Sequence, residues 1–198
     1  TPWQNVAFRT LGETFSTAAL CLALSLHARS PRRDALVGAV AATAFVARYP
    51  AGLYLVPFAL AYVVARDLRG LARWALGAAL VLLGLGALDA LTWGRPWHSV
   101  LAYADYNLLR DRARLDYGAR PWWFYLACLP ALAPLAFLAA SVPGARWRRG
   151  GLALSVALTY LAAMSLLAHK EPRFFLPTVP LLVMAAASST GSAELRAG

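Results

Sequence analysis

Residues 151–190 read GLALSVALTYLAAMSLLA, then HKEPRF, then FLPTVPLLVMAAASST. Two apolar runs therefore flank a polar hexapeptide, His169–Phe174, which contains Lys170, the only lysine of the chain. Charge between membrane-length apolar segments lies at a membrane face or lines a cavity, because each charge buried in the bilayer costs roughly 2.5–3.5 kcal/mol on insertion scales. We therefore expect the hexapeptide to be a site at a membrane boundary.

The composition predicts an all-α integral membrane protein, a polytopic helical bundle. Of 198 residues, 60% are hydrophobic and 14% charged, and the mean hydropathy is +0.55, which is too apolar for a water-soluble domain. The net charge of +10 comes from arginines spread over short loops, so it indicates loops held on one membrane side and excludes nucleic acid as the expected partner. Cys21 and Cys128 lie inside apolar runs and read as small hydrophobes. No motif predicts a metal or a cofactor.

Seven apolar runs predict about seven membrane spans, with one transmembrane domain over residues 1–198. We interpret residues 35–65 as two helices meeting near Pro50, because three arginine clusters then share one side; a single long helix would put the first cluster opposite the others. The two-helix reading places residues 1–12, Arg48–Pro50, 93–121 and 169–173 on the outer face. The runs are 13–28, 35–47, 51–65, 71–92, 122–142, 151–168 and 174–190, and the clusters are Arg29, Arg32 and Arg33; Arg66, Arg69 and Arg73; and Arg146, Arg148 and Arg149.

The outer segment 93–121 is rich in aromatic residues. They indicate either an interfacial aromatic belt or a stacking surface for a sugar or an apolar chain. Within it, Ser99–Leu115 carries apolar residues at helical spacing with charges between them. This pattern predicts an amphipathic helix lying along the membrane surface.

The hexapeptide offers the chemistry of a phosphate site. Pro172 suits the first turn of a helix, so we expect the last span to begin there with its positive N-terminal end at the outer face. Lys170, Arg173 and His169 would then hold a phosphate. Glu171 would organise these cations or accept a proton. The alternative is a juxtamembrane anchor of snorkelling basic residues.

A second cation, Arg48, stands beside a turn on the same face, where the alternative is a turn arginine with local partners. A catalytic base is harder to find. Asp105, Asp111 and Asp116 have the spacing of a solvated helix face, and Asp89 at a helix end is expected to pair locally. We therefore expect the base to lie outside this sequence.

Several motifs together resemble one family. The hexapeptide, followed by Pro177 and Pro180, resembles the His-Lys-Glu-x-Arg-Phe signature of glycosyltransferase family 22, the multi-spanning mannosyltransferases of lipid-linked oligosaccharide and GPI-anchor assembly. The family's outer-loop pattern of Asp, Trp-x-x-Pro, Phe-Asn, Tyr-Gly and His-Pro-Trp resembles Asp89, Trp93-Gly94, Pro96, Asn107, Tyr117-Gly118 and Pro121-Trp122 with Tyr125. Arg48-Tyr49-Pro50 stands where the family has Arg-Pro-Thr, and Arg9-Thr10 resembles its Arg-Thr helix start. Arg120 and Phe124 depart from the family's histidine and tryptophan.

The resemblance implies a GT-C fold and transfer of a sugar, mannose, from a polyprenyl-phosphate donor to a lipid-linked or cell-envelope glycan acceptor. It also implies a catalytic carboxylate in a first outer loop. We expect that loop before Thr1, in a longer protein, so that this fragment alone is inactive. The phosphate would be bound by His169, Lys170, Arg173 and Arg48, and the acceptor or loop contacts would be Trp97, Asn107, Tyr117, Trp122 and Tyr125.

The resemblance implies an integral membrane protein that is in contact with membrane lipids. The preference for Ala, Arg, Gly and Pro suggests a bacterial cytoplasmic membrane, with the endoplasmic reticulum as the eukaryotic alternative. The rival function is a transporter or flippase for an anionic lipid. That function predicts ionisable residues at mid-membrane depth, whereas the apolar runs carry almost none.

Overall fold

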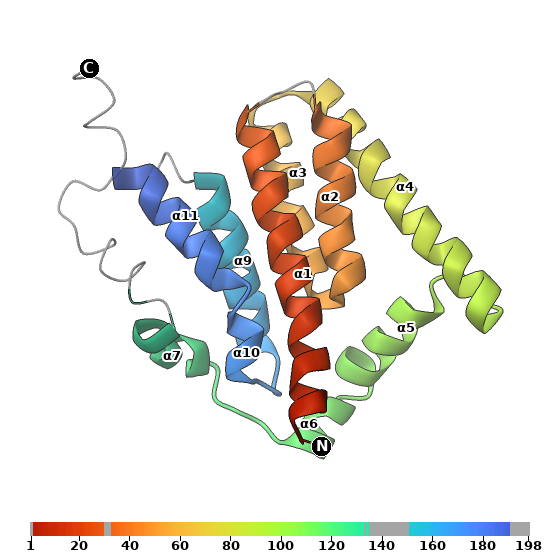
Figure 1. Ribbon diagram of the computed structural model, residues 1–198, viewed down its shortest axis with the longest axis vertical. Coiled ribbons are helices and arrows are strands. Elements are labelled where there is room, and N and C mark those ends of the chain that lie inside the picture. Colours follow the sequence, from red (N-terminus) through yellow and green to blue (C-terminus); the bar gives the residue numbers. More distant parts are fainter. Residues whose placement is uncertain (1, 30–32, 133, 135–150, 191–198) are drawn as a thin grey trace.

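The structure is a computed structural model that describes residues 2–29, 33–132, 134 and 151–190. Across these residues it is helical and contains no strand, which confirms the predicted all-α class (Figure 1). The helices are α1 (Pro2–Arg29), α2 (Asp34–Ala47), the 3₁₀ helix η2 (Tyr49–Tyr54), α3 (Leu55–Val64), α4 (Leu68–Trp93), α5 (His98–Ala104), the π-helix η3 (Asp105–Leu109), α6 (Arg112–Tyr117), α7 (Phe124–Leu132), α9 (Gly151–Leu166), α10 (Pro172–Phe175) and α11 (Thr178–Thr190).

Glycines set the crossing of α2 and α4. A Cβ atom on Gly38 would lie 1.9 Å from the carbonyl oxygen of Trp74, and one on Gly77 would lie 1.8 Å from that of Ala35. Only glycine fits at either position, so the two backbones approach closely, as is typical of helix pairs in membranes. At the same end of the bundle Asp34 is buried and accepts hydrogen bonds from Arg73 (2.7 Å) and Tyr62 (2.8 Å). This carboxylate therefore joins α2, α3 and α4.

The core between the two halves of the bundle is aromatic. Tyr54 of η2 stacks on Tyr160 of α9 with ring centroids 4.5 Å apart, and both rings are buried. Phe58 of α3, Phe175 of α10 and Leu181 of α11 are also buried in this core. This packing joins the α1–α4 half to the α9–α11 half and fixes α9, which ends at Leu166, shortly before the hexapeptide.

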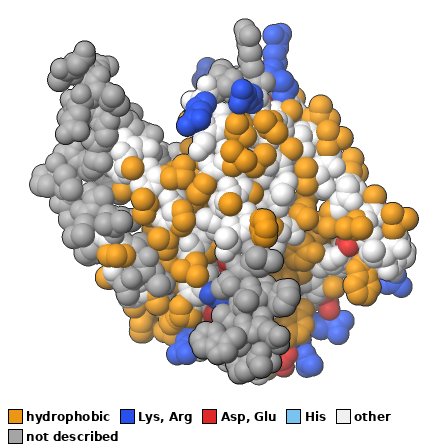
Figure 2. Space-filling model, in the orientation of Figure 1, with side chains coloured by type: hydrophobic (Ala, Val, Ile, Leu, Met, Phe, Trp, Pro, Cys, Tyr) orange, Lys and Arg blue, Asp and Glu red, His pale blue; other side chains and the backbone are white. Residues whose placement is uncertain are grey.

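The break between α2 and α3 occurs where the arginine distribution predicted it. Helix α2 ends at Ala47, Arg48 is extended (φ −156°), and Pro50 lies in the first turn of η2. The C-terminus of α1 and the N-terminus of α4 therefore lie at the same end of the bundle (Figure 1). Apolar side chains cover the middle of the face shown in Figure 2, with Lys and Arg toward its two ends. The third arginine cluster, Arg146 to Arg149, lies outside the described residues.

One helix of the described chain is long and apolar enough to cross a membrane by length and composition. This helix is α4, with 26 residues, and it exposes leucines such as Leu76, Leu80 and Leu91 on its surface. The segments Asp34–Ala47, Tyr49–Val64, Gly151–Leu166 and Pro172–Ser188 are apolar but shorter. The expected number of seven spans therefore stays a prediction.

Two local expectations need correction. The outer segment does not form one helix over Ser99–Leu115, because it is divided into α5, η3 and α6, and Asp111 adopts a left-handed backbone (φ +45°) that interrupts the helix. Pro172 does begin a helix, but this helix is the short α10, and the longer α11 begins at Thr178. Asp89 pairs locally, as expected: it is buried and accepts hydrogen bonds from the backbone N–H (2.8 Å) and the hydroxyl of Ser99.

Candidate functional site

A pocket of about 430 Å³ lies where three separate segments meet. The first segment is the break after α2, the second is the outer segment, and the third is the end of α9 with the hexapeptide. All three segments are predicted to lie on the outer face, and the pocket brings them together. The polar and aromatic side chains that line it are Arg48 and Tyr49; Tyr103, Tyr106, Asn107, Asp111 and Tyr117; and His169, Glu171, Arg173 and Phe174.

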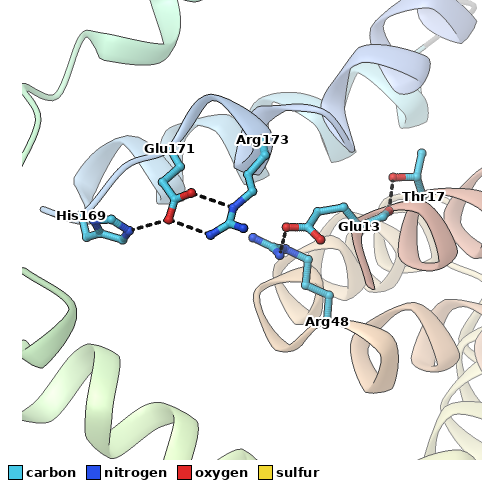
Figure 3. A network of polar contacts seen from close by, with 6 residues as sticks. All are labelled: Glu13, Thr17, Arg48, His169, Glu171 and Arg173. Atoms are coloured by element: carbon cyan, nitrogen blue, oxygen red, sulfur yellow. Dashed lines mark hydrogen bonds and ion pairs between the residues drawn. The ribbon is translucent and has the colours of Figure 1, made fainter. Parts of the chain in front are cut away.

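Glu171 is the centre of the hexapeptide. Its Oε1 lies 3.1 Å from Nε2 of His169 and accepts a hydrogen bond from Nη2 of Arg173 at 2.7 Å, while its Oε2 lies 2.7 Å from Nε of Arg173 (Figure 3). The backbone of Glu171 is extended, and Pro172 begins α10 directly after it. This turn places His169 and Arg173 on either side of one carboxylate, so Glu171 orients both side chains toward the pocket.

Arg48 is held from the opposite side by a carboxylate that sequence analysis did not identify. Its Nη1 donates to Oε1 of Glu13 on α1, and the side chains are only 15% (Arg48) and 4% (Glu13) exposed. The guanidinium groups of Arg48 and Arg173 point toward one another (Figure 3). Their central carbons lie 4.7 Å and 5.3 Å from the centre of the same Phe174 ring. The one signal in the sequence is that Glu13 is an acidic residue at the edge of a long apolar run.

Lys170 is directed elsewhere. It is 5% exposed and does not line the pocket; its Nζ donates to the carbonyl oxygen of Arg120 (3.1 Å) and to that of Leu167. The backbone N–H of Arg120 in turn donates to the carbonyl oxygen of Ala168 (3.0 Å). Burial lowers the pKa of the Lys170 ammonium. The structure therefore places the predicted phosphate ligand between two backbone segments.

The outer segment forms the remaining wall of the pocket through aromatic contacts. The ring of Tyr103 lies edge-on to Tyr49 with centroids 5.3 Å apart, and Tyr117 lies 5.3 Å from the ring of His169. Asn107, in the π-helix, donates to the carbonyl oxygen of Tyr103 (2.9 Å). The Tyr106 hydroxyl donates to Asp116 (2.6 Å), and this hydrogen bond raises the pKa of Tyr106 to about 12.

The other expected loop contacts lie outside the pocket. Trp97 packs on Gly86 of α4 and donates from its indole N–H to the carbonyl oxygen of Leu82 (3.0 Å). Trp122 is 66% exposed, and Tyr125 is buried against Phe175. Of the five predicted loop contacts, Asn107 and Tyr117 therefore line the pocket. Arg9 and Thr10 fall in a part of α1 whose side chains lie outside the described residues.

This arrangement suits an anionic ligand that also carries a hydroxyl-rich or apolar part. Two guanidinium groups and an imidazole meet on one side, and guanidinium groups bind phosphate oxygens through paired N–H donors. Each guanidinium already has a carboxylate partner, so the donors are oriented before a ligand arrives. Of the two carboxylates that line the pocket, Asp111 and Glu171, Glu171 is occupied by this task.

The sequence matches the pattern of the Alg9-like mannosyltransferase family over residues 3–195. Similar curated proteins include GPI mannosyltransferase 3 of Yarrowia lipolytica, 34% identical over 111 residues, which cover 56% of this chain and 22% of that protein. GPI mannosyltransferase 3 of Trypanosoma brucei brucei is 30% identical over 135 residues, covering 61% of this chain and 24% of that protein. Alpha-1,2-mannosyltransferase alg9 of Schizosaccharomyces pombe is 30% identical over 207 aligned positions, covering 89% of this chain and 35% of that protein.

The chain thus spans about a fifth to a third of the length of these relatives. All three organisms are eukaryotes, so the relatives give no support to the expected bacterial membrane. No solved structure matches the chain.

Proposed function

Because the chain belongs to the Alg9-like mannosyltransferase family, we propose that its full-length protein transfers mannose from a polyprenyl-phosphate donor to a lipid-linked or cell-envelope glycan. The pocket at the outer end of the bundle would bind the donor phosphate. One observation carries this proposal: Arg48 and Arg173, which are 125 positions apart in the sequence, converge on one aromatic ring in the same pocket. The family and the apolar helix α4 indicate a membrane protein.

The proposed chemistry is an inverting transfer. A hydroxyl group of the acceptor attacks the anomeric carbon of mannose, and the bond from that carbon to the phosphate oxygen breaks. The bonding electrons remain on the phosphate oxygen, and the hydroxyl proton would pass to a carboxylate of the full-length protein. The negative charge of the leaving phosphate therefore increases during the reaction.

Arg48 and Arg173 would stabilise that increasing charge. Donors that are already oriented lower the barrier most when the charge they face grows in the transition state. Glu171 and Glu13 would act as positioning residues, because each fixes one guanidinium group without taking part in bond changes. His169 would add a further donor at the edge of the phosphate site.

The proposal is tested with Arg173→Gln in the full-length protein. We expect kcat/KM for mannosyl transfer to fall by about 10²–10³, the usual effect of removing one donor that faces a developing charge. Arg110→Gln is the matched control: it removes an equal charge from an exposed arginine that pairs with Asp105 outside the pocket, and it should leave the rate unchanged. Transfer by Arg173→Gln near the wild-type rate, with normal membrane insertion, contradicts the phosphate site.

The comparisons lend no support to the flippase alternative.

A further inference from the structure

Asp111 is a pocket carboxylate that the phosphate site does not use. It lines the same pocket as Glu171, but Glu171 is held by His169 and Arg173. In the part of the chain that the structure describes, the ion-pair partner of Asp111 is Arg114 at 3.7 Å, and both side chains are about half exposed. Exposed pairs at this distance are weak. The oxygens of Asp111 therefore remain accessible to a ligand in the pocket.

The backbone holds Asp111 in an unusual position. Its φ of +45° lies in the left-handed region, which non-glycine residues seldom occupy. It follows directly on the π-helix η3 and Arg110, and π-helical turns are frequent at functional sites. Asn107, within η3, also lines the pocket. The helical break that sequence analysis did not foresee is therefore the feature that places Asp111 and Asn107 on one wall.

The chemistry of this wall differs from that of the phosphate side. A carboxylate repels an anion but accepts hydrogen bonds from hydroxyl groups, and an amide both donates and accepts. One amide N–H of Asn107 donates to the carbonyl oxygen of Tyr103, and its other N–H and its oxygen make no further hydrogen bond among the described residues. Tyr49, Tyr103 and Tyr117 add aromatic faces. Hydroxyl groups on a ring with apolar faces match these features.

We propose that Asp111 and Asn107 form the sugar-binding part of the pocket, with Asp111 accepting hydrogen bonds from the hydroxyl groups of a hexose ring. This inference rests on the proposed mannosyl transfer, and it divides the pocket into a cationic phosphate side and a carboxylate–amide sugar side. The hexose is the one carried by the donor or the one that ends the acceptor glycan. Both present the same hydroxyl chemistry, and the experiment separates them.

The test compares two lipids on the full-length protein, polyprenyl phosphate and polyprenyl-phosphate mannose. Asp111→Asn keeps the size of the side chain and tolerates the left-handed backbone. If the pocket holds the donor hexose, this change should reduce the affinity advantage of the mannosyl lipid by about tenfold and leave binding of the bare phosphate within about twofold. If it holds the acceptor hexose, the acceptor KM should rise about tenfold instead. Both measurements at wild-type values would overturn the inference.

Two further variants separate this result from other causes. Asp111→Gly suits the left-handed backbone and removes the carboxylate, so it should show the same loss without disturbing the fold. Asp105→Asn removes an equal charge from a partly exposed carboxylate outside the pocket and should have no effect. Arg173→Gln should weaken binding of both lipids, because they share the phosphate. If Arg173→Gln loses lipid binding while the Asp111 variants bind both lipids as the wild type does, only the sugar site is contradicted. If Arg173→Gln itself binds both lipids as the wild type does, the proposed function is contradicted.

Discussion

The ion pair between Arg48 and Glu13 fixes one of the two guanidinium groups of the pocket. Both side chains are largely buried, and removing one member of such a pair leaves a charge without compensation in a medium of low polarity. The pair joins α1 to the start of η2 at the pocket wall. Its loss should therefore affect the stability of the bundle as well as the orientation of Arg48.

We expect Glu13→Gln to lower the free energy of unfolding by about 3 kcal/mol, the lower range for breaking a buried ion pair. The measurement is the thermal unfolding of the full-length protein in detergent. The double variant Glu13→Gln with Arg48→Gln should regain part of the loss, because it also removes the orphaned charge. This account is contradicted if Glu13→Gln is as stable as the wild type. It is also contradicted if the double variant loses more unfolding free energy than the two single variants lose together.

Residue types alone predicted some of this site and misplaced other parts. His169, Glu171 and Arg173 could be predicted because they are neighbours in the sequence and differ in kind from the runs around them. Glu13 could not, since its partner is 35 residues away and only the packing of α1 against α2 brings them together. Lys170 was expected at the phosphate on the basis of its charge. Its burial and its two backbone acceptors give it a different place.

Among the structural elements, the loop after α9 and the end of the outer segment are joined through Lys170. Its ammonium bridges the carbonyl oxygens of Arg120 and Leu167, and the backbone of Arg120 bonds to Ala168. The ring of Tyr117, just before this joint, lies against His169. Lys170 is thus a positioning residue that keeps the outer wall of the pocket against the hexapeptide.

Lys170→Met should loosen this joint. It removes two part-buried hydrogen bonds from an ammonium group to carbonyl oxygens, each worth about 1.5–3 kcal/mol. Hydrogen exchange of the full-length protein should become faster in residues 103–121, and kcat/KM for mannosyl transfer should fall. Lys170→Arg keeps donors for both carbonyls and should restore part of the protection. Unchanged exchange over 103–121 in Lys170→Met would show that the joint does not depend on this ammonium.

Helix boundaries could be predicted from the sequence where charged residues or a proline lie at the boundary. They could not be predicted where only the backbone conformation of one residue ends the helix. The distribution of arginines placed a break near Pro50, and α2 ends at Ala47. In the outer segment the apolar spacing of Ser99–Leu115 is that of a continuous helix, yet Asp111 turns into the left-handed region. Apolar spacing carries no signal for such a turn, because aspartate is also common on solvated helix faces.

At the scale of the whole molecule, the two ends of the bundle have separate chemistry. One end carries the arginines around Asp34, and the other carries the pocket. The glycines between α2 and α4 let these two helices pack closely. Helix α4 runs between the two ends, from Leu68 to Trp93, and is the described helix that meets the length and composition of a membrane span. The position of the pocket at a membrane face therefore depends on α4 crossing the bilayer.

This crossing predicts the accessibility of two exposed arginines at opposite ends of α4, Arg69 in its first turn and Arg95 just after its last residue. We expect Arg69→Cys to react with an impermeant thiol reagent only from the cytoplasmic side, because the arginine-rich end lies inside by the positive-inside rule. Arg95→Cys, at the pocket end, should react only from the opposite side. The measurement uses sealed vesicles of both orientations that hold the full-length protein, with Cys21 and Cys128 replaced by alanine. Labelling of both positions from one side would mean that α4 lies within the membrane surface or the protein interior. The pocket would then no longer lie on the membrane side opposite the arginine-rich end.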